Sequence, residues 1–194
     1  GVYGSILVLF TILYMLTILL MEKKDKEIYK GLSDTDALTG LFNRRAFQAA
    51  VDETLLKRIA GVFIFIDVDN FKDYNDKYGH ANGDLCLKHF AAAMKKCFPK
   101  DSILGRYGGD EFVVYIKNAA SDDAHRYMDE FQREISHLIM AGGEHVTVSA
   151  SAGGVAFIGE GEDFVSLCRS ADNMLYDVKR NGKGTFKIKG AKNM

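Results

Sequence analysis

Residues 106–112 read Arg-Tyr-Gly-Gly-Asp-Glu-Phe and lie between two apolar runs, one ending at Leu104 and one extending to Ile116. Two adjacent glycines between such runs predict a tight hairpin, with φ above zero at both glycines as a primed turn requires. Asp110 and Glu111 follow the turn, and neighbouring residues of a strand point to opposite faces. If one face is covered, the two acids cannot both be ordinary surface charge. A polar hairpin tip is one explanation, and a metal site is the other.

A second acidic cluster ends an apolar strand further upstream. Residues 62–66 read Val-Phe-Ile-Phe-Ile, which is typical of a central strand covered on both faces. Asp67, Val68, Asp69 and Asn70 follow. Acids at the end of a buried strand are costly unless they are paired or bind a cation. Capping of the next short helix explains Asp69 or Asn70 well and Asp67 poorly, so we expect Asp67 to be a metal ligand.

Length and composition indicate one globular domain with a short appendage. A chain of 194 residues can bury an ample core, and a net charge of −1 provides no basic field for nucleic acid. The three cysteines have no CxxC spacing, which argues against a zinc site and suits a reducing cytosol.

The appendage is residues 1–21, which contain no charged side chain. As a helix this segment would be roughly 30 Å long, about one bilayer core. A signal peptide would begin with Met and a basic stretch, and a core helix this apolar is rare in a small domain. We therefore expect a transmembrane helix, preceded by an N-terminal sensor region outside this sequence. Lysines 23, 24, 26 and 30 follow it and place the next domain in the cytoplasm, attached to the inner membrane.

Residues 22–33 connect this helix to the globular domain. Met21, Ile28 and Leu32 form a brief seam compatible with a parallel two-helix stalk, and Gly31 weakens it. A solvated tether fits the same pattern, so the sequence leaves a linker and a paired signalling helix as alternatives.

The globular domain over residues 34–194 alternates helical and strand-like patterns. The order predicts an α+β fold, with an antiparallel-rich central sheet flanked by helices. Helices are expected over 46–55, 71–78, 81–97, 121–138 and 164–180, and strands over 62–66, 102–107, 111–117, 146–152 and 185–188.

The two acidic clusters predict one site. If the hairpin lies beside the strand that ends at Asp67, all of these acids meet at one edge of the sheet. Clustered carboxylates repel one another unless a hard cation lies between them. Mg²⁺ binds one or two carboxylates and then substrate phosphates, and two such ions can clamp an in-line displacement at phosphorus. The residues alone predict metal-dependent phosphoryl or nucleotidyl transfer, without naming a substrate.

Four stretches, in order, resemble the GGDEF family of diguanylate cyclases. Residues 106–112 match its signature, and residues 36–45, 67–84 and 171–179 are similar to its other motifs. The resemblance covers about residues 34–188 and implies a palm-like fold, akin to nucleotide cyclases and polymerases. It implies that two GTP molecules are condensed into cyclic di-GMP plus two pyrophosphates. It also implies a homodimer in which each subunit holds one GTP and the two half-sites face each other.

The same resemblance assigns metal and catalytic roles. Asp67, the Val68 carbonyl and Asp110 would bind Mg²⁺, with Mn²⁺ as an alternative. Asp110 would also be the base for the attacking ribose 3′-hydroxyl, and Glu111 would assist at the metal.

It assigns substrate contacts as well. Asn75 and Asp84 would read guanine, because a carboxylate that accepts from the N1–H and amino groups distinguishes guanine from adenine. Lys72 would offset phosphate charge. Lys179 and Lys183 would reach the triphosphate.

Two departures from the family pattern affect these expectations. Lys183 and Gly184 stand where the family usually has Arg and Asn, and Lys lacks the bidentate fork, so we expect weaker phosphate binding. Pro99 and Ser102 stand where the product-inhibition motif Arg-x-x-Asp would lie, so the primary feedback site should be absent.

The main alternative is a catalytically inactive GGDEF module that binds GTP or cyclic di-GMP as a receptor. The intact signature argues against lost catalysis, and the missing Arg-x-x-Asp argues against product reception. A mixed cyclic GMP–AMP synthase would need a changed guanine contact, but Asp84 retains the usual one. A pure dimerisation scaffold would have no need of Asp67, Asp110 and Asp84 together.

Overall fold

A computed structural model describes residues 11–21, 34–136 and 147–190 of the chain. The chain divides into two compact units, Gly1–Asp34 and Thr35–Met194. The linker predicted over 22–33 lies outside the described residues, as do the first ten residues of the predicted membrane helix.

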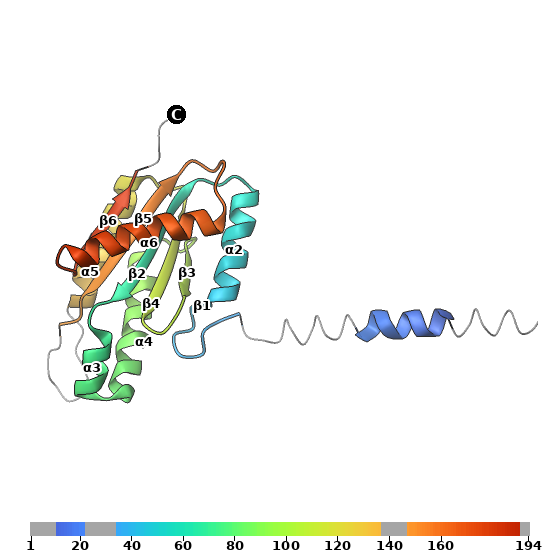
Figure 1. Ribbon diagram of the computed structural model, residues 1–194, viewed down its shortest axis with the longest axis horizontal. Coiled ribbons are helices and arrows are strands. Elements are labelled where there is room, and N and C mark those ends of the chain that lie inside the picture. Colours follow the sequence, from blue (N-terminus) through green and yellow to red (C-terminus); the bar gives the residue numbers. More distant parts are fainter. Residues whose placement is uncertain (1–10, 22–33, 137–146, 191–194) are drawn as a thin grey trace, which may run out of the picture. The chain divides into compact units, whose positions relative to one another are not determined.

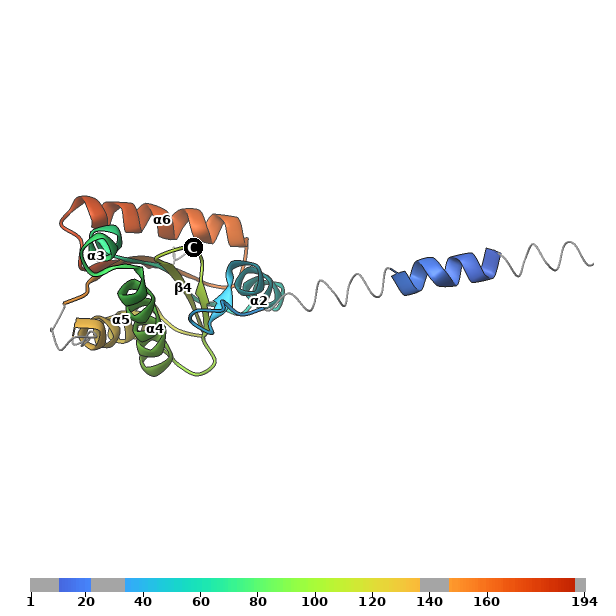
Figure 2. The ribbon, with the colours of Figure 1, turned by 90° about the horizontal axis from the view of Figure 1, so that it is seen from below.

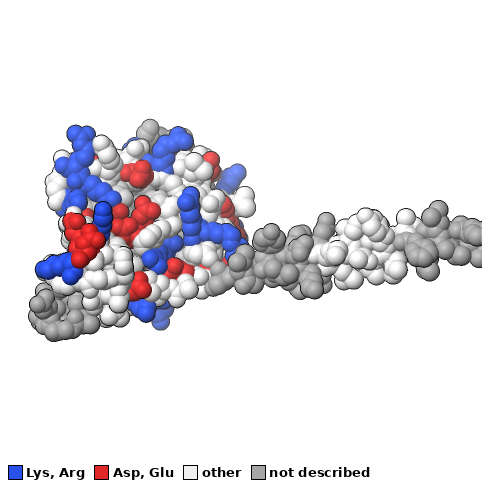
Figure 3. Space-filling view, turned by 60° about the horizontal axis from the view of Figure 1, so that its bottom comes forward, with Lys and Arg blue, Asp and Glu red and all other residues white. Residues whose placement is uncertain are grey.

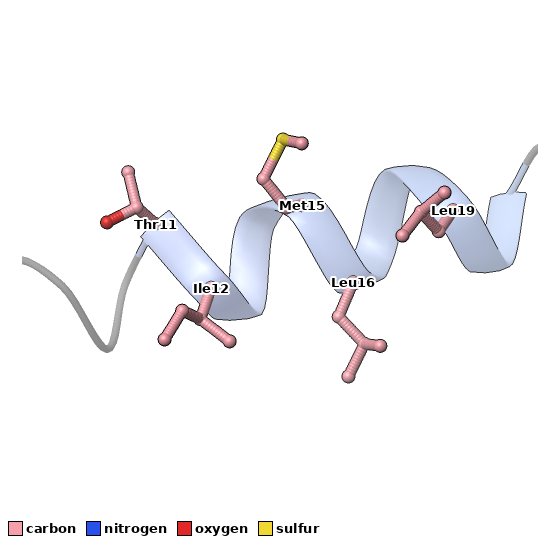
Figure 4. Close-up of a pocket in the computed structure, with 5 residues that line it drawn as sticks. All are labelled: Thr11, Ile12, Met15, Leu16 and Leu19. Atoms are coloured by element: carbon pink, nitrogen blue, oxygen red, sulfur yellow. The ribbon is translucent and has the colours of Figure 1, made fainter.

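In the first unit, residues 11–21 form a helix whose side chains are all uncharged and exposed. An open apolar pocket on this helix is lined by Thr11, Ile12, Met15, Leu16 and Leu19, whose side chains are drawn in Figure 4. At about 1.5 Å per residue the helix is roughly 16 Å long, about half of a bilayer core. Among the described residues, no helix has the length and hydropathy that a membrane span requires. The transmembrane helix over 1–21 stays a prediction, because part of it lies outside the described residues.

The second unit is built on a six-stranded sheet with the order β1-β3-β4-β2-β5-β6 (Figure 1). The central strand β2 pairs antiparallel with β4 and β5, and β3 pairs antiparallel with β4. The edge strands β1 and β6 pair parallel with β3 and β5. The predicted α+β architecture is therefore confirmed, as a mixed sheet with an antiparallel centre. The strands are β1 (Phe42–Asn43), β2 (Gly61–Val68), β3 (Ile103–Arg106), β4 (Glu111–Lys117), β5 (Ala150–Phe157) and β6 (Phe186–Lys189).

Helices cover both faces of this sheet, and Figure 2 shows α6 on one side with α4 and α5 on the other. Because strand residues alternate between faces, Phe63 and Phe65 of β2 join the core under α2 and α6. Ile64 and Ile66 join the core under α4 and α5. The prediction of a central strand covered on both faces is confirmed. The helices are α2 (Arg44–Leu56), α3 (Phe71–Tyr78), α4 (His80–Cys97), α5 (Ser121–Ser136) and α6 (Phe164–Arg180).

One strand lies away from its predicted position. The strand expected over 146–152 is β5, which begins at Ala150 and continues through Gly153. At Gly153 helix α6 crosses the strand so closely that a Cβ would lie 2.1 Å from the Leu175 nitrogen and 2.3 Å from the Ala171 carbonyl oxygen. Glycine is therefore required for packing there and does not end the strand.

A second difference concerns residues 42–43, just before the helix expected over 46–55, where no strand was predicted. Phe42 and Asn43 instead form the short strand β1 against β3 before α2 begins. The Asn43 side chain then caps α2, because its Oδ1 accepts a hydrogen bond from the Ala46 N–H over 3.0 Å. The helices expected over 71–78 and 164–180 have the predicted bounds.

Candidate active site

The acids predicted to bind metal meet where β2 ends and β4 begins. Asp67 lies directly across from Glu111 in the antiparallel register. The Val68 N–H donates to the Asp110 carbonyl oxygen over 3.2 Å. Directly opposed residues of an antiparallel pair point to the same face, which for Asp67 and Glu111 is the face covered by α6. The structure therefore places all four predicted metal-site residues where β2 and β4 pair at this end of the sheet.

Lys179, in the last turn of α6, lies beside this group. Its Nζ is 2.8 Å from Oδ2 of Asp67, whose side chain is only 14% exposed. Burial raises the pKa of Asp67, Lys179 opposes that rise, and the carboxylates of Asp110 and Asp69 add to it. Burial also raises the pKa of Glu111, with Asp67 and Asp110 adding to the rise and Lys179 opposing it. One lysine thus partly compensates several acids, and this end of the sheet favours cations.

The turn between β3 and β4 is closed by an arginine. Neither Gly108 nor Gly109 has a positive φ, so the predicted primed turn is wrong. Arg106 donates from Nε and Nη2 to the Gly109 carbonyl oxygen, over 3.1 and 2.7 Å. Its Nη1 lies 3.2 Å from both carboxylate oxygens of Asp36, 70 positions upstream. Because the guanidinium fork is rigid, it fixes the turn against the start of the domain.

Asp36 is itself fixed by local hydrogen bonds. Its Oδ1 accepts from the Thr39 N–H over 2.9 Å and from the Thr39 hydroxyl over 2.7 Å. Burial disfavours its ionised form, but the hydrogen bonds from Thr39 and Arg106 outweigh burial and hold the pKa of Asp36 below its usual value. The motif at residues 36–45 therefore supports the signature loop directly.

Asp69 has a role that the sequence did not reveal. Its Oδ1 accepts from the Ser151 hydroxyl over 2.6 Å, and its Oδ2 accepts from the Ser149 hydroxyl over 2.8 Å and the Gly184 N–H over 3.0 Å. Capping of α3 is therefore the wrong explanation for Asp69. Asn70 occupies the N-cap position, but its side chain makes no capping hydrogen bond. The sequence feature that points to this role is the pair of serines at positions 149 and 151, which alternate near the start of β5.

The same network holds the loop after α6 against the end of β2. The Lys183 Nζ lies 2.8 Å from the Asn70 Oδ1. Lys183 and Gly184 have φ of 60° and 65°, a left-handed conformation that glycine adopts without strain. Asn, which the family usually has in place of Gly184, also tolerates that conformation. Both lysines predicted to reach the triphosphate, Lys179 and Lys183, therefore lie at the end of β2.

The residues predicted to read guanine lie on the helix pair α3 and α4, which follows β2 (Figure 1). Gly83 lets the helices approach, because a Cβ there would lie 1.9 Å from the Asn75 Oδ1. That oxygen is buried and has no hydrogen-bond partner within the described part of the chain. A buried acceptor calls for a donor from water or a ligand. Asp84 and Lys72 are exposed on the same helix pair.

The chemistry of the donor set fits a hard divalent cation. The carboxylates of Asp67, Asp110 and Glu111 and the Val68 carbonyl are all oxygen donors, which Mg²⁺ and Mn²⁺ prefer. Within residues 11–21, 34–136 and 147–190, no three His, Cys, Asp or Glu side chains form a ready ligand cluster. One of the donors, Asp67, is instead paired with Lys179.

Comparison with known proteins identifies the family. Residues 33–185 match the family described as "Diguanylate cyclase, GGDEF domain". This chain belongs to the GGDEF domain family. The match covers most of the chain and includes every predicted site residue of this GGDEF domain.

Individual relatives are moderately similar. This GGDEF chain is 33% identical over 168 residues to the cyclic di-GMP phosphodiesterase PdeR of Escherichia coli, covering 85% of this chain and 25% of PdeR. It is 34% identical over 164 residues to a diguanylate cyclase of Vibrio cholerae, covering 81% and 50%. The crystal structure of the GGDEF domain of DgcB from Caulobacter crescentus, in complex with c-di-GMP, aligns with a TM-score of 0.74 at 27% identity, covering 80% and 95%. The chain spans between a quarter and half of the length of these two curated relatives.

Proposed function

We propose that this GGDEF domain is an active diguanylate cyclase that condenses two GTP molecules into cyclic di-GMP and two pyrophosphates. The register that sets Asp67 opposite Glu111 is the observation that carries the proposal. Asp110 and Lys179 lie beside this pair, so acidic and basic groups suited to a metal–triphosphate complex meet at one place. The likeness to the diguanylate cyclase of Vibrio cholerae supports the same activity.

The reaction forms two phosphodiester bonds. In each half, the 3′-oxygen of one GTP forms a bond to the α-phosphorus of the other. The bond from that phosphorus to the oxygen bridging to the β-phosphate breaks, and pyrophosphate leaves. Asp110 is the proposed base that accepts the hydroxyl proton. Bound Mg²⁺, or Mn²⁺, at Asp67, Val68, Asp110 and Glu111 supplies neutralisation of phosphate charge.

Substrate binding uses the second set of residues. Lys179 and Lys183 bind the triphosphate, and Lys72 offsets its charge. Asn75 and Asp84 read guanine, and the unpartnered buried oxygen of Asn75 supports this, because guanine carries N–H donors. Figure 3 shows acidic and basic side chains interspersed over one face, a pattern that suits a small nucleotide better than nucleic acid.

The proposed assembly is a homodimer at the membrane. Because each subunit holds one GTP, two catalytic domains must face each other, with residues 22–33 as a further contact or as a tether. The uncharged, exposed helix over 11–21 supports membrane attachment through residues 1–21 (Figure 4). The catalytic domain would then lie in the cytoplasm at the inner membrane, under control of a sensor region upstream.

Product feedback through the primary site is proposed to be absent. Pro99 and Ser102 supply no charge at the two positions where the family motif has Arg and Asp. The Ser102 N–H donates a hydrogen bond to the Pro99 carbonyl oxygen over 3.0 Å. Cyclic di-GMP added at the start of an assay should therefore leave the initial rate unchanged.

The second candidate function is an inactive module that binds GTP or cyclic di-GMP as a receptor. The likeness to PdeR supports this candidate. That protein contains a region similar to this chain, yet it is named as a phosphodiesterase and not as a cyclase. The intact acids at residues 110 and 111 favour the cyclase.

One incubation separates the two functions. The 194-residue chain in mild detergent, given GTP and Mg²⁺, should form cyclic di-GMP that is identified by mass. Asp110→Ala should abolish product formation with an unchanged circular dichroism spectrum. Asp101→Ala, an exposed acid in the loop before β3, is the matched control and should retain activity. Binding of GTP without product in the unchanged chain would favour the receptor, and full turnover by Asp110→Ala would refute the assigned role of Asp110.

A further inference from the structure

Lys179 and Asp67 each have a different partner in the structure than in the proposed reaction. In the structure they form an ion pair, with 2.8 Å between Nζ and Oδ2. In the reaction, Asp67 would bind a divalent cation and Lys179 would bind the triphosphate. The two arrangements cannot hold together, because an ammonium group and a divalent cation at the same carboxylate oxygen repel each other.

We propose that Lys179 is the resident counter-ion of Asp67 and makes metal binding at Asp67 conditional on the nucleotide. This inference rests on the proposed function and adds an order to it. The triphosphate gives Lys179 a new anionic partner and frees Asp67 at the same moment. Metal without nucleotide must displace the lysine with no such compensation.

The surroundings of Asp67 explain why a counter-ion is needed. Asp67 is largely buried and directly opposes Glu111, and like charges in directly opposed positions destabilise a sheet. A largely buried carboxylate also requires a compensating charge. Lys179 can supply this charge and still leave, because its side chain is 37% exposed and its ammonium group is carried on a flexible four-carbon stem.

Lys183 provides an internal contrast. It is also predicted to bind the triphosphate, but its Nζ contacts the neutral Asn70 side chain over 2.8 Å. Releasing Lys183 therefore uncovers no carboxylate at the metal site. Of these two lysines, only Lys179 competes with a cation for Asp67.

The test measures Mn²⁺ binding to the 194-residue chain in mild detergent, without nucleotide, from the electron paramagnetic resonance signal of free Mn²⁺. Lys179→Met should raise Mn²⁺ affinity on the order of tenfold, a typical coupling between two sites. The same variant should bind an α,β-methylene analogue of GTP more weakly. Lys183→Met, the matched control, should also weaken analogue binding but leave the Mn²⁺ affinity unchanged. Lys179→Arg, which keeps the counter-charge, should bind Mn²⁺ like the unchanged chain.

The outcomes are distinct. Unchanged or weaker Mn²⁺ binding in Lys179→Met overturns the inference, and formation of cyclic di-GMP by the unchanged chain shows that the proposed function survives. An equal gain in Lys183→Met also overturns it, because any lost positive charge would then suffice. Lys179→Gln repeats the measurement, so a folding defect in one variant does not decide the result. If the unchanged chain binds no Mn²⁺ even with the analogue, the proposed function fails as well.

Discussion

Asp67 and Asp69 are two residues apart at the end of one strand, yet they are held in opposite ways. Asp69 is buried and accepts hydrogen bonds from two hydroxyls and one backbone N–H, all neutral donors. Asp67 faces another acid and is held by one lysine on a flexible stem. Neutral donors within the fold fix a carboxylate in place, whereas a mobile cation holds it exchangeably. The same residue type thus serves structure at one position and chemistry at the other.

The largest effect expected from this contrast is on turnover at Asp67. Asp67→Asn keeps the side-chain shape but removes the charge that the metal requires. Cyclic di-GMP formation should fall at least about a thousandfold, or about 4 kcal/mol of transition-state stabilisation. The free energy of unfolding should change by less than about 1 kcal/mol, because the repulsion from Glu111 is lost along with the ion pair to Lys179. Urea denaturation and a GTP assay measure the two quantities, and strong destabilisation would erase the contrast.

The next effect is on stability at Asp69. Asp69→Ala leaves the Ser149 and Ser151 hydroxyls without their acceptor and removes one of the two acceptors of the Gly184 N–H, which keeps only the Ser151 hydroxyl oxygen. The change should cost about 2–3 kcal/mol of unfolding free energy. The KM for GTP should also rise, because the loop that carries Lys183 loses its anchor. Ser151→Ala should cost more than Ser149→Ala, since Ser151 is fully buried. A fully stable Asp69→Ala in urea denaturation would show that Asp69 is not structural.

The smallest effect is a pH dependence at Glu111. Its pKa is raised in the folded state from 4.5, first by burial and then by Asp67 and Asp110. A raised carboxyl pKa means that stability is fully present below the unfolded pKa and is lost as the pH rises through the folded pKa. The stability of the unchanged chain relative to Glu111→Gln should therefore fall in urea denaturation as the pH rises above the ordinary carboxyl range. The control is Glu130→Gln, which changes an exposed acid on α5. A rise in relative stability with pH in the Glu111 comparison would contradict the raised pKa of Glu111.

Local patterns predicted much of the fold. The apolar run at residues 62–66 predicted the central strand, and the helical pattern over residues 164–180 predicted the bounds of α6, Phe164–Arg180. The position of β5 was missed because the tolerance of Gly153 depends on where α6 crosses, which no local pattern contains. The shape of the signature turn was missed for a similar reason, since Arg106 takes its carboxylate partner from 70 positions away.

In the candidate site, too, local patterns predicted some features, and contacts between distant residues determine the others. Strand ends and the hairpin predicted that Asp67 and Glu111 would meet, and the register agrees. The partners of Asp69 lie 80 to 115 positions away, so the sequence analysis explained this residue locally, as a helix cap. The pairing of Lys179 with Asp67 was likewise invisible, because it joins the end of α6 to the end of β2.

The close approach of α6 to β5 at Gly153 also affects where Lys179 lies in the active site. The Leu175 backbone nitrogen lies 2.1 Å from the position that a Cβ of residue 153 would take, and Leu175 lies one helical turn before Lys179 on the same side of α6. Because any larger side chain at residue 153 would overlap the backbone of α6, only glycine lets the helix lie this close to the strand. Gly153, which carries no functional group, thus helps to set the distance between α6 and the sheet, and with it the position from which the Lys179 ammonium group reaches Asp67.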